Sequence, residues 1–268
     1  MSAPGKTAAL AAALAILAAT PACRRASGDM VVLAGSSTMG PIFQGLEPYF
    51  AGHGIKIQVQ GDGSSVGVKS ARERLALFGL ASRELSEQEK KEFLHQTIAR
   101  DGVAIIVHAG NPLEEASADL IREIYSGKRL QWESGEPITV INKESGRATL
   151  EVFEEHFGLK NAIRKDAVII GPNGQAVASV ARDPNAIAYV SIADAKAAAD
   201  NGTPVKLLSL GGIPATAENV KNGTYPLSRP LNVVYLPENK DRAEAILALL
   251  AAPEVRAEMM KLSFVPMR

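Results

Sequence analysis

The chain has 268 residues, of which 46% are hydrophobic and 22% charged, and its 29 basic and 29 acidic residues give no net charge. This length allows one large or two medium domains with an ample core, and the balanced charge argues against a nucleic-acid or polyanionic partner. An attraction for an anion must therefore be local and come from a pocket.

The N-terminal segment predicts export. Lys6 precedes an Ala/Leu/Ile run from Thr7 to Ala19 that is too short to cross a bilayer, so residues 1–27 are interpreted as a cleaved secretory signal. Cys23 is the only cysteine, which excludes an intrachain disulfide, and its place after Thr20-Pro21-Ala22 makes it a candidate for lipidation. Because Thr and Pro are unusual there, an ordinary cleaved signal without lipidation is the alternative.

From Met30 onward, short apolar strands alternate with helical segments, which predicts an α/β fold. Three strands run into turns rich in Ser, Thr and Gly that then open a helix. The strands are 31–34, 55–59 and 138–141, and their turns are Gly35 to Thr38, Gly61 to Ser65 and Lys143 to Thr149. Amide groups at a helix N-terminus lack intrahelical acceptors and carry partial positive charge, so three converging turns would bind an oxyanion.

The remaining elements predict two lobes. A helix opens at Pro41 and is ended or kinked at Pro48, and a capping box at Ser86 opens a helix through Leu94. Further helices are expected over 66–75, around 120–125, from the turn at 143–149 through 157, and over 175–181, 241–250 and 253–262, and strands over 77–81, 103–108, 168–170, 186–190 and 226–236. Crossing segments at 108–112 and 225–231 then divide the chain into lobe I, 28–108 plus 231–268, and lobe II, 109–230. The cleft between the lobes is the expected ligand site.

Several of these segments, taken together in their order and spacing, resemble the phosphate-binding proteins that serve ABC importers, a family of type II periplasmic binding proteins. The similar segments are Gly35 to Pro41, Gly63 to Lys69, Ala81 to Arg83, Asp101 to Val107, Ile124 to Lys128, Trp132 and Asn142 to Phe153. The resemblance implies a two-lobed type II fold that captures inorganic phosphate and hands it to a permease and an ATPase. It also implies a monomer that is not an enzyme, uses no cofactor, and touches the membrane only through a lipid anchor.

The resemblance also implies the site residues, which are hydroxyls, amides and basic groups of the turns. They are Ser37, Thr38, the amide of Met39, Ser64, Ser82, Arg83, Lys143, Gly146, Arg147, Ala148 and Thr149. Lys143 stands where arginine is usual in the family, and Arg147-Ala148 replaces Ser-Gly. The last turn therefore loses a hydroxyl and gains a fixed charge, and Arg147 is expected to make the bidentate contact that a lysine cannot make.

Ligand choice depends on a hydrogen-bond acceptor. Some family members carry an aspartate at the position of Arg83, where it accepts the proton of hydrogen phosphate and repels sulfate, whereas an arginine only donates. Glu144, Asp62 and Glu84 are the candidate acceptors, left unranked. Phosphate is the expected ligand, with sulfate, molybdate or a phosphonate as alternatives.

A different class of function is also consistent with one motif. Gly63 to Gly67 fits G-x-S-x-G between a strand and a helix, as in serine hydrolases with Ser65 as nucleophile. The histidines lack a suitable loop context, since His95 and His156 fall in expected helices and His108 ends a strand, so no enzyme activity is predicted. No metal-ligand spacing and no complete dinucleotide motif is present, and an exported sensory protein that kept this fold is a third alternative.

Overall fold

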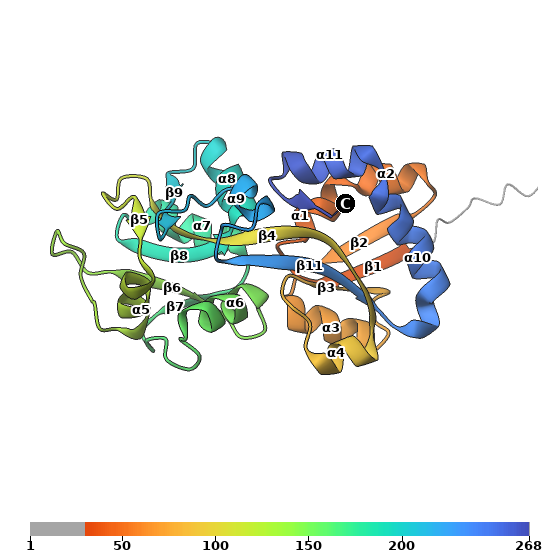
Figure 1. Cartoon of the computed structure of the whole chain (residues 1–268), viewed down its shortest axis with the longest axis horizontal. Coiled ribbons are helices and arrows are strands. Elements are labelled where there is room, and N and C mark those ends of the chain that lie inside the picture. Colours follow the sequence, from red (N-terminus) through yellow and green to blue (C-terminus); the bar gives the residue numbers. More distant parts are fainter. Residues whose placement is uncertain (1–29, 268) are drawn as a thin grey trace, which may run out of the picture.

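The computed structural model describes residues 30–267, and within that range it shows two α/β lobes lying side by side (Figure 1). The predicted signal segment 1–27 and the candidate lipidation site Cys23 lie outside the described residues. Within 30–267, no helix has the length and apolar character needed to cross a membrane.

Each lobe combines strands with covering helices, and the two lobes share β4 (Leu94–His108) and β11 (Ser228–Tyr235). Lobe I, on the right of Figure 1, contains β1 (Met30–Gly35), α1 (Gly40–Gly45), α2 (Glu47–Gly52), β2 (Lys56–Gln60), α3 (Ser64–Arg72), β3 (Phe78–Ala81), α4 (Glu87–Glu92), η1 (Pro237–Asn239), α10 (Lys240–Ala248), η2 (Leu249–Ala251), α11 (Pro253–Lys261) and β12 (Val265–Pro266). Lobe II contains β5 (Glu115–Ala116), α5 (Ala118–Ser126), β6 (Thr139–Lys143), α6 (Ala148–Phe157), β7 (Val168–Ile170), α7 (Asn173–Arg182), β8 (Ala186–Ser191), α8 (Ile192–Asp200), β9 (Val205–Leu207), β10 (Ser209–Leu210) and α9 (Ala217–Lys221).

Ten strands form one sheet with the order β2-β1-β3-β11-β4-β8-β6-β7, in which β9 and β12 also pair with β4, and β5 and β10 form a separate two-stranded sheet. Strand β4 joins the lobes, because its residues 94–102 pair with β11 and its residues 103–107 pair with β8, both antiparallel. The partner therefore changes inside one strand. The lobe boundaries predicted from the sequence, 28–108 plus 231–268 and 109–230, stay a prediction.

Parallel pairing places the predicted turns at two facing edges. Strands β2, β1 and β3 are parallel neighbours, so the turns after them meet at one edge of lobe I. Strands β7, β6 and β8 are parallel neighbours in lobe II, so the segments after them also share an edge. Ligands of open α/β sheets bind beyond the carboxyl ends of strands, which is where these turns lie.

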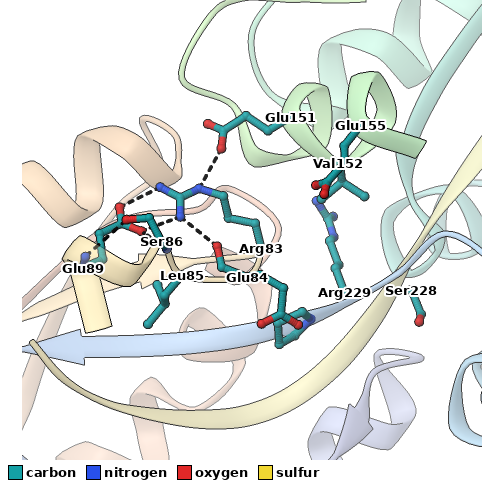
Figure 2. Close-up of a pocket in the computed structure, with 11 residues that line it drawn as sticks. Arg83, Glu84, Leu85, Ser86, Glu89, Glu151, Val152, Glu155, Ser228 and Arg229 are labelled. Atoms are coloured by element: carbon teal, nitrogen blue, oxygen red, sulfur yellow. Dashed lines mark hydrogen bonds and ion pairs between the residues drawn. The ribbon is translucent and has the colours of Figure 1, made fainter. Parts of the chain in front are cut away.

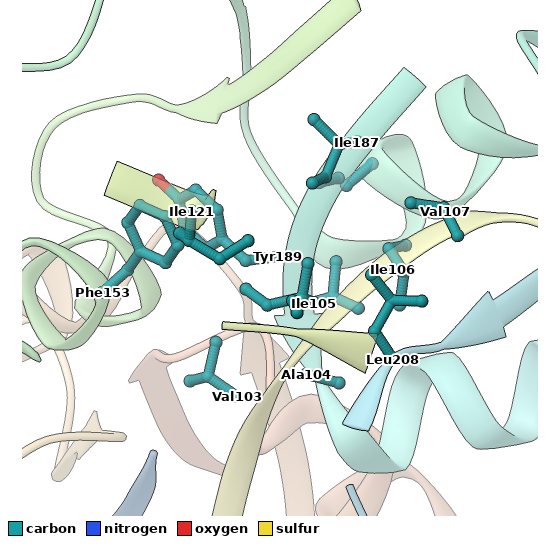
Figure 3. Packing of buried hydrophobic residues seen from close by; sticks show 14 of the residues in the cluster. Val103, Ala104, Ile105, Ile106, Val107, Ile121, Phe153, Ile187, Tyr189 and Leu208 are labelled. Carbon is teal, nitrogen blue, oxygen red and sulfur yellow. The ribbon is translucent and has the colours of Figure 1, made fainter. Parts of the chain in front are cut away.

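Apolar packing fixes the turn that opens α6. Residues 103–107 of β4 are fully buried, as expected of a strand covered on both faces, and they pack beside β8 (Figure 3). The ring of Phe153 from α6 stacks on Tyr189 from β8 with 3.9 Å between ring centroids. Burying a large apolar side chain is worth about 1.5–3 kcal/mol, so these contacts hold α6 firmly against the sheet.

A glycine fixes the position of α3 in lobe I. A Cβ atom on Gly67 would lie 2.3 Å from the carbonyl oxygen of Ala34 and 2.5 Å from Cα of Gly35. Helix α3 therefore packs against β1 more closely than any side chain at that position would allow. This contact brings Ser64, the first residue of α3, next to the turn after β1.

The sequence predicted most of these elements, but it gave no prediction for α8, α9 and the short strands β5, β9, β10 and β12, and it placed one boundary wrongly. The capping box at Ser86 is present, and Leu46 separates α1 from α2 just before Pro48, as expected. However, α4 ends at Glu92 and β4 begins at Leu94, so the expectation that His95 is helical is wrong. The first part of β4 contains polar residues and lacks the apolar pattern of a strand, so the sequence did not predict it. It forms a strand because it pairs with β11.

Candidate functional site

Lobe I presents buried hydroxyl groups from the turns after its parallel strands. Ser36 Oγ lies 2.9 Å from Ser82 Oγ, and the amide of Ser82 donates to Ser64 Oγ at 3.1 Å. These serines and Thr38 are all nearly inaccessible to solvent. Buried hydroxyls need hydrogen-bond partners, and here the predicted Ser64 and Ser82 are partners, while Ser36, which was not predicted, is the partner of the Ser82 hydroxyl.

Lobe II presents a buried ammonium at the end of β6. Lys143 is 3% exposed, and its Nζ lies 3.4 Å from the carbonyl oxygen of Gly171. Burial lowers the pKa of Lys143 to about 7, and the charge of Asp194 opposes that shift. With a pKa near 7, the Lys143 side chain is only partly protonated at neutral pH. An anion bound next to it would stabilise the protonated, positively charged form.

Arg147, the N-cap residue of α6, reaches from lobe II to lobe I. Its Nε and Nη2 donate to Glu144 Oε1, the former at 2.8 Å, and its Nη1 donates to the carbonyl oxygen of Gly61 at 3.0 Å. The charge of Arg147 is thus matched by Glu144. One of its N–H groups links the two lobes.

The lobes touch directly beside this link. The amide of Ser65 donates to the carbonyl oxygen of Gly146 at 3.2 Å, and a Cβ atom on Gly63 would lie 2.9 Å from the same oxygen. Gly63 also has a φ of +108°, a conformation that side-chain-bearing residues rarely adopt. Glycine at this position therefore permits the approach of the two turns.

At the centre of the interface lies a buried ion pair that the sequence did not reveal. Arg229 on β11 donates from Nε and Nη2 to Asp101 Oδ2 at 3.1 and 2.8 Å, from Nη1 to Thr149 Oγ1 at 2.9 Å, and from Nη2 to Thr38 Oγ1 at 3.0 Å. Ser191 Oγ donates to Asp101 Oδ1 at 3.0 Å. We call these five residues the central polar network. Burial raises the pKa of Asp101, and the guanidinium of Arg229 opposes that rise.

A second pair of polar groups, of which Asn173 is buried and Asp194 is half-buried, adjoins this network. Asn173 Nδ2 donates to Thr38 Oγ1 at 3.1 Å and to Asp194 Oδ2 at 2.6 Å. Burial raises the pKa of Asp194 to about 6. Asn173 opens α7 after β7, and Asp194 lies in the first turn of α8 after β8, so both occupy the lobe II edge described above.

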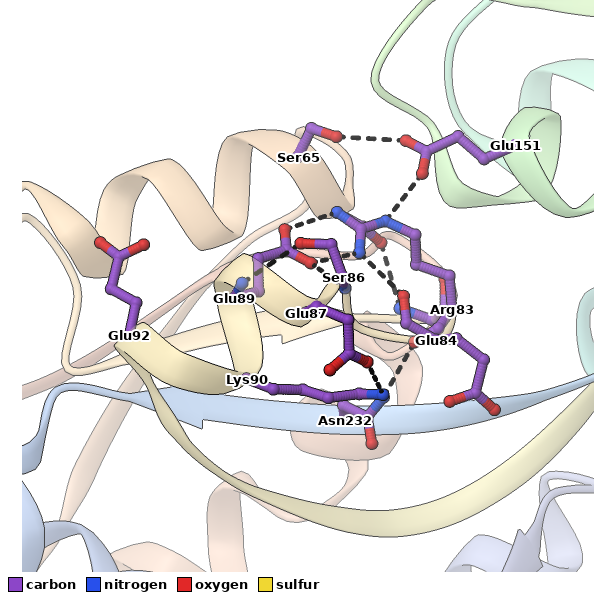
Figure 4. A network of polar contacts seen from close by, with 12 residues as sticks. Ser65, Arg83, Glu84, Ser86, Glu87, Glu89, Lys90, Glu92, Glu151 and Asn232 are labelled. Atoms are coloured by element: carbon purple, nitrogen blue, oxygen red, sulfur yellow. Dashed lines mark hydrogen bonds and ion pairs between the residues drawn. The ribbon is translucent and has the colours of Figure 1, made fainter.

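Arg83 occupies a different place, at the rim of the interface (Figure 4). Its Nη1 and Nη2 donate to Glu89 at 2.8 and 2.9 Å, and its Nε lies 2.8 Å from Glu151 Oε2 of lobe II without hydrogen-bond alignment. Ser65 Oγ donates to the other oxygen of Glu151 at 3.2 Å, and Ser86 caps α4 beside Glu89. We call these five residues the rim network. The hydrogen bond from Arg83 is the main cause that lowers the pKa of Glu89 to about 2.

A pocket of about 500 Å³ opens between the lobes beside the rim network (Figure 2). Its walls are Arg83 to Ser86, Glu89, Glu151, Val152, Glu155 and Ser228 to Pro230. Four glutamates and two arginines give this pocket net negative charge. It is therefore poorly suited to an anion, and neither the buried hydroxyls nor Lys143 line it.

The other predicted residues have simple surroundings. The amide of Met39 donates to the carbonyl oxygen of Ser36 at 3.1 Å, while its side chain belongs to the lobe I core. Ser37 is half-buried, and Ala148 is buried where α6 begins. Ser65, the nucleophile expected of a hydrolase, contacts Glu151 and no histidine among the residues of 30–267. In that same range, no group of His, Cys, Asp or Glu side chains is arranged to hold a metal ion.

Sequence reasoning thus missed six residues of the site: Ser36 and Asp101 were noted only as parts of motifs, and Arg229, Asn173, Ser191 and Asp194 were not noted. One signal was available for Arg229, a single charged residue between the apolar Leu227 and Leu231. A charged residue within an expected buried strand requires a buried partner. No sequence pattern identified Asp101 as that partner.

Comparisons with known proteins agree with this architecture. A family model described as a PBP superfamily domain matches residues 17–254. A phosphate-binding protein of Staphylococcus saprophyticus is 28% identical over 77% of this chain and 69% of its own length, and one of Streptococcus agalactiae is 32% identical over 40% of this chain and 38% of its own. The chain thus matches less than half the length of the Streptococcus agalactiae relative and about two thirds of the length of the Staphylococcus saprophyticus relative.

Solved structures show the same fold. A Clostridium perfringens protein solved with bound phosphate, and assigned as a phosphate ABC transporter substrate-binding protein, has a TM-score of 0.83 and 29% identity, covering 90% of this chain and all of the other. A phosphate transport receptor from Vibrio cholerae has a TM-score of 0.71 at 24% identity over 88% of this chain. The predicted two-lobed type II fold is therefore confirmed.

Proposed function

Because the chain belongs to the family of PBP superfamily domains, we propose that it is an extracytoplasmic solute-binding protein. In this proposal it captures inorganic phosphate between its lobes and delivers it to the permease and ATPase of an ABC importer. It acts as a monomer, binds without turnover, and is anchored to the membrane, if lipidated, only at Cys23.

The observation that carries the proposal is the set of buried donors at the two facing edges. Lobe I contributes the hydroxyls of Thr38, Ser64 and Ser82, and lobe II contributes Lys143 and Thr149. Uncharged donors from both lobes, together with the buried cation of lobe II, suit a small oxyanion. Such an anion would be enclosed when the lobes meet. The relatives described as phosphate-binding proteins support phosphate as that anion.

The expected affinity follows from these contacts. Hydrogen bonds to a charged group contribute about 1.5–3 kcal/mol each before the costs of closure and desolvation. Several of them make a dissociation constant in the micromolar range or tighter reasonable. We therefore expect strong binding from a protein whose overall charge is zero.

Titration calorimetry tests the proposal on protein that has been unfolded, freed of bound phosphate and refolded. Phosphate should release heat and raise the melting temperature, and hydrolysis of phosphate or carboxylate esters should be undetectable. Absence of both heat and a thermal shift at millimolar phosphate would contradict the proposal. Ester turnover abolished by Ser65→Ala would instead support a hydrolase.

We further propose that Asp194 is the acceptor that distinguishes hydrogen phosphate from sulfate. Glu144 is paired with Arg147, and Asp62 and Glu84 are exposed, whereas Asp194 bonds through Asn173 to Thr38 in the site. Among the described residues, only one of its two carboxylate oxygens has a hydrogen-bond partner. Sulfate should compete poorly with phosphate in the natural protein and better in Asp194→Asn; equal competition in both removes Asp194 from this role.

A further inference from the structure

Three hydroxyls in the site accept hydrogen bonds from groups that cannot accept in return. Thr38 Oγ1 accepts from Arg229 Nη2 at 3.0 Å and from Asn173 Nδ2 at 3.1 Å. Thr149 Oγ1 accepts from Arg229 Nη1 at 2.9 Å, and Ser64 Oγ accepts from the amide of Ser82 at 3.1 Å. Among residues 30–267, none of these three hydroxyls donates to a protein group.

A hydroxyl has one hydrogen and two lone pairs, so each bond it accepts limits what it can still do. Both lone pairs of Thr38 Oγ1 are used, by Arg229 and by Asn173. Its hydrogen is then the one part of the group left for a ligand. Thr38 therefore acts toward a ligand as a donor, although a free threonine hydroxyl both donates and accepts.

The two groups that fix Thr38 are themselves fixed by carboxylates. Asp101 accepts two hydrogen bonds from Arg229, and Asp194 accepts one from Asn173. Contact with the carboxylate requires the NH₂ side of the Asn173 amide to face Asp194, because the amide oxygen would be repelled. The carboxylates of Asp101 and Asp194 thus orient two donor groups toward the hydroxyls, which leaves the hydrogens of those hydroxyls available to a ligand.

We propose that Arg229 is a positioning residue for the bound anion, which sets the hydroxyls of Thr38 and Thr149 as obligate donors without contacting the anion itself. This inference rests on the proposed function, since it assumes an oxyanion between the lobes. Thr38 belongs to lobe I and Thr149 to lobe II, and the fork of one guanidinium reaches both. Both hydroxyls are therefore directed by Arg229 when the lobes are together, which links recognition of the anion to closure.

The test is a double-mutant cycle read by phosphate calorimetry. In the natural protein, Thr38→Val should weaken phosphate binding about 10-fold or more, while Thr38→Ser, which keeps the hydroxyl, should stay within about threefold. Arg229→Lys keeps a positive charge beside Asp101 but loses the two-pronged guanidinium. In that background, Thr38→Val should weaken phosphate binding by less than about twofold. The matched control is Arg74→Lys, an exposed arginine paired with Glu238, which should leave binding and the cycle unchanged.

Three outcomes decide the matter. The role of Arg229 is overturned if Thr38→Val weakens phosphate binding equally in both backgrounds. It is also overturned if Arg229→Lys binds phosphate with the affinity of the natural protein. If Arg229→Lys shows no cooperative melting, the cycle is repeated in Arg229→Met with Asp101→Asn, which leaves no unpaired buried charge, and the same results apply. Failure of the natural protein to bind phosphate would sink the proposed function itself, and it is seen before any variant is made.

Discussion

The central polar network and the rim network both join the lobes through an arginine and a carboxylate, but they differ in exposure. The side chains of Arg229 and Asp101 are 1% and 0% exposed, whereas those of Arg83 and Glu151 are 13% and 39% exposed. Water and salt screen the outer pair, while the inner pair has lost its hydration and depends on its partners. The same kind of ion pair therefore has two roles. At the centre it positions hydroxyl groups, and at the rim it is a weak contact between the lobes.

The largest expected effect comes from breaking the central pair. Asp101→Leu removes the carboxylate and leaves the guanidinium of Arg229 buried without its counter-charge, which should lower the free energy of unfolding by about 3–5 kcal/mol. Urea denaturation measures the loss. Glu238→Leu removes the partner of the exposed Arg74 and should cost less than about 1 kcal/mol; similar losses in the two variants would show that burial does not separate them.

Lys143 should control proton uptake on binding. Its pKa is about 7 in the folded chain and 10.5 ordinarily, so between these values the unfolded chain holds more protons, and the stability of the ligand-free protein rises with pH there. A bound anion raises this pKa again, so affinity through this group should fall as pH rises above about 7.

Calorimetry in two buffers of different ionisation enthalpy, at about pH 8, detects that proton uptake. Lys143→Met should abolish the contribution of this group and weaken phosphate binding by about 1.5–3 kcal/mol. The ionisation of phosphate itself is common to both proteins and cancels in the difference. Identical proton uptake by the variant and the natural protein would remove Lys143 from the site.

Glu89 tests the inner end of the rim, where the side chain is 11% exposed. Its pKa is about 2 instead of 4.5, chiefly because Arg83 donates to it, so its stabilising effect is complete above about pH 4.5 and is lost as pH falls toward 2. Glu89→Gln should cost about 2 kcal/mol at neutral pH and flatten the fall in stability between those values. Glu87→Gln on the same helix is the control, and a fall as steep in Glu89→Gln as in the natural protein would contradict the assignment.

The smallest effect is expected at the outer end of the rim. Glu151→Gln breaks a partly exposed contact with Arg83, so it should change the free energy of unfolding by about 0.2–1 kcal/mol and phosphate affinity by less than about fivefold. The change should shrink further in high salt, because exposed charges are screened. A loss that matches Asp101→Leu and persists in high salt would erase the distinction between rim and centre.

Local sequence patterns were enough to place the turns that form the two edges. Strand-turn-helix patterns around Thr38, Ser64 and Thr149 depend on residues close together in the chain, and the structure has each of them. The capping box at Ser86 is local for the same reason. By contrast, β4 was predicted to begin at Val103 and begins at Leu94, because its polar first half is a strand only through pairing with β11.

By itself, the sequence determined the alternation of strands and helices, the turns with their hydroxyls, and the resemblance that points to phosphate. Only the tertiary structure decided which charges meet, since Asp101 and Arg229 are 128 residues apart and become partners through the antiparallel pairing of β4 with β11. It also turned Arg83 toward Glu89 and Glu151, and Arg147 toward Glu144 and the carbonyl oxygen of Gly61. Side-chain partners depend on distances across the fold, and no local pattern encodes those distances.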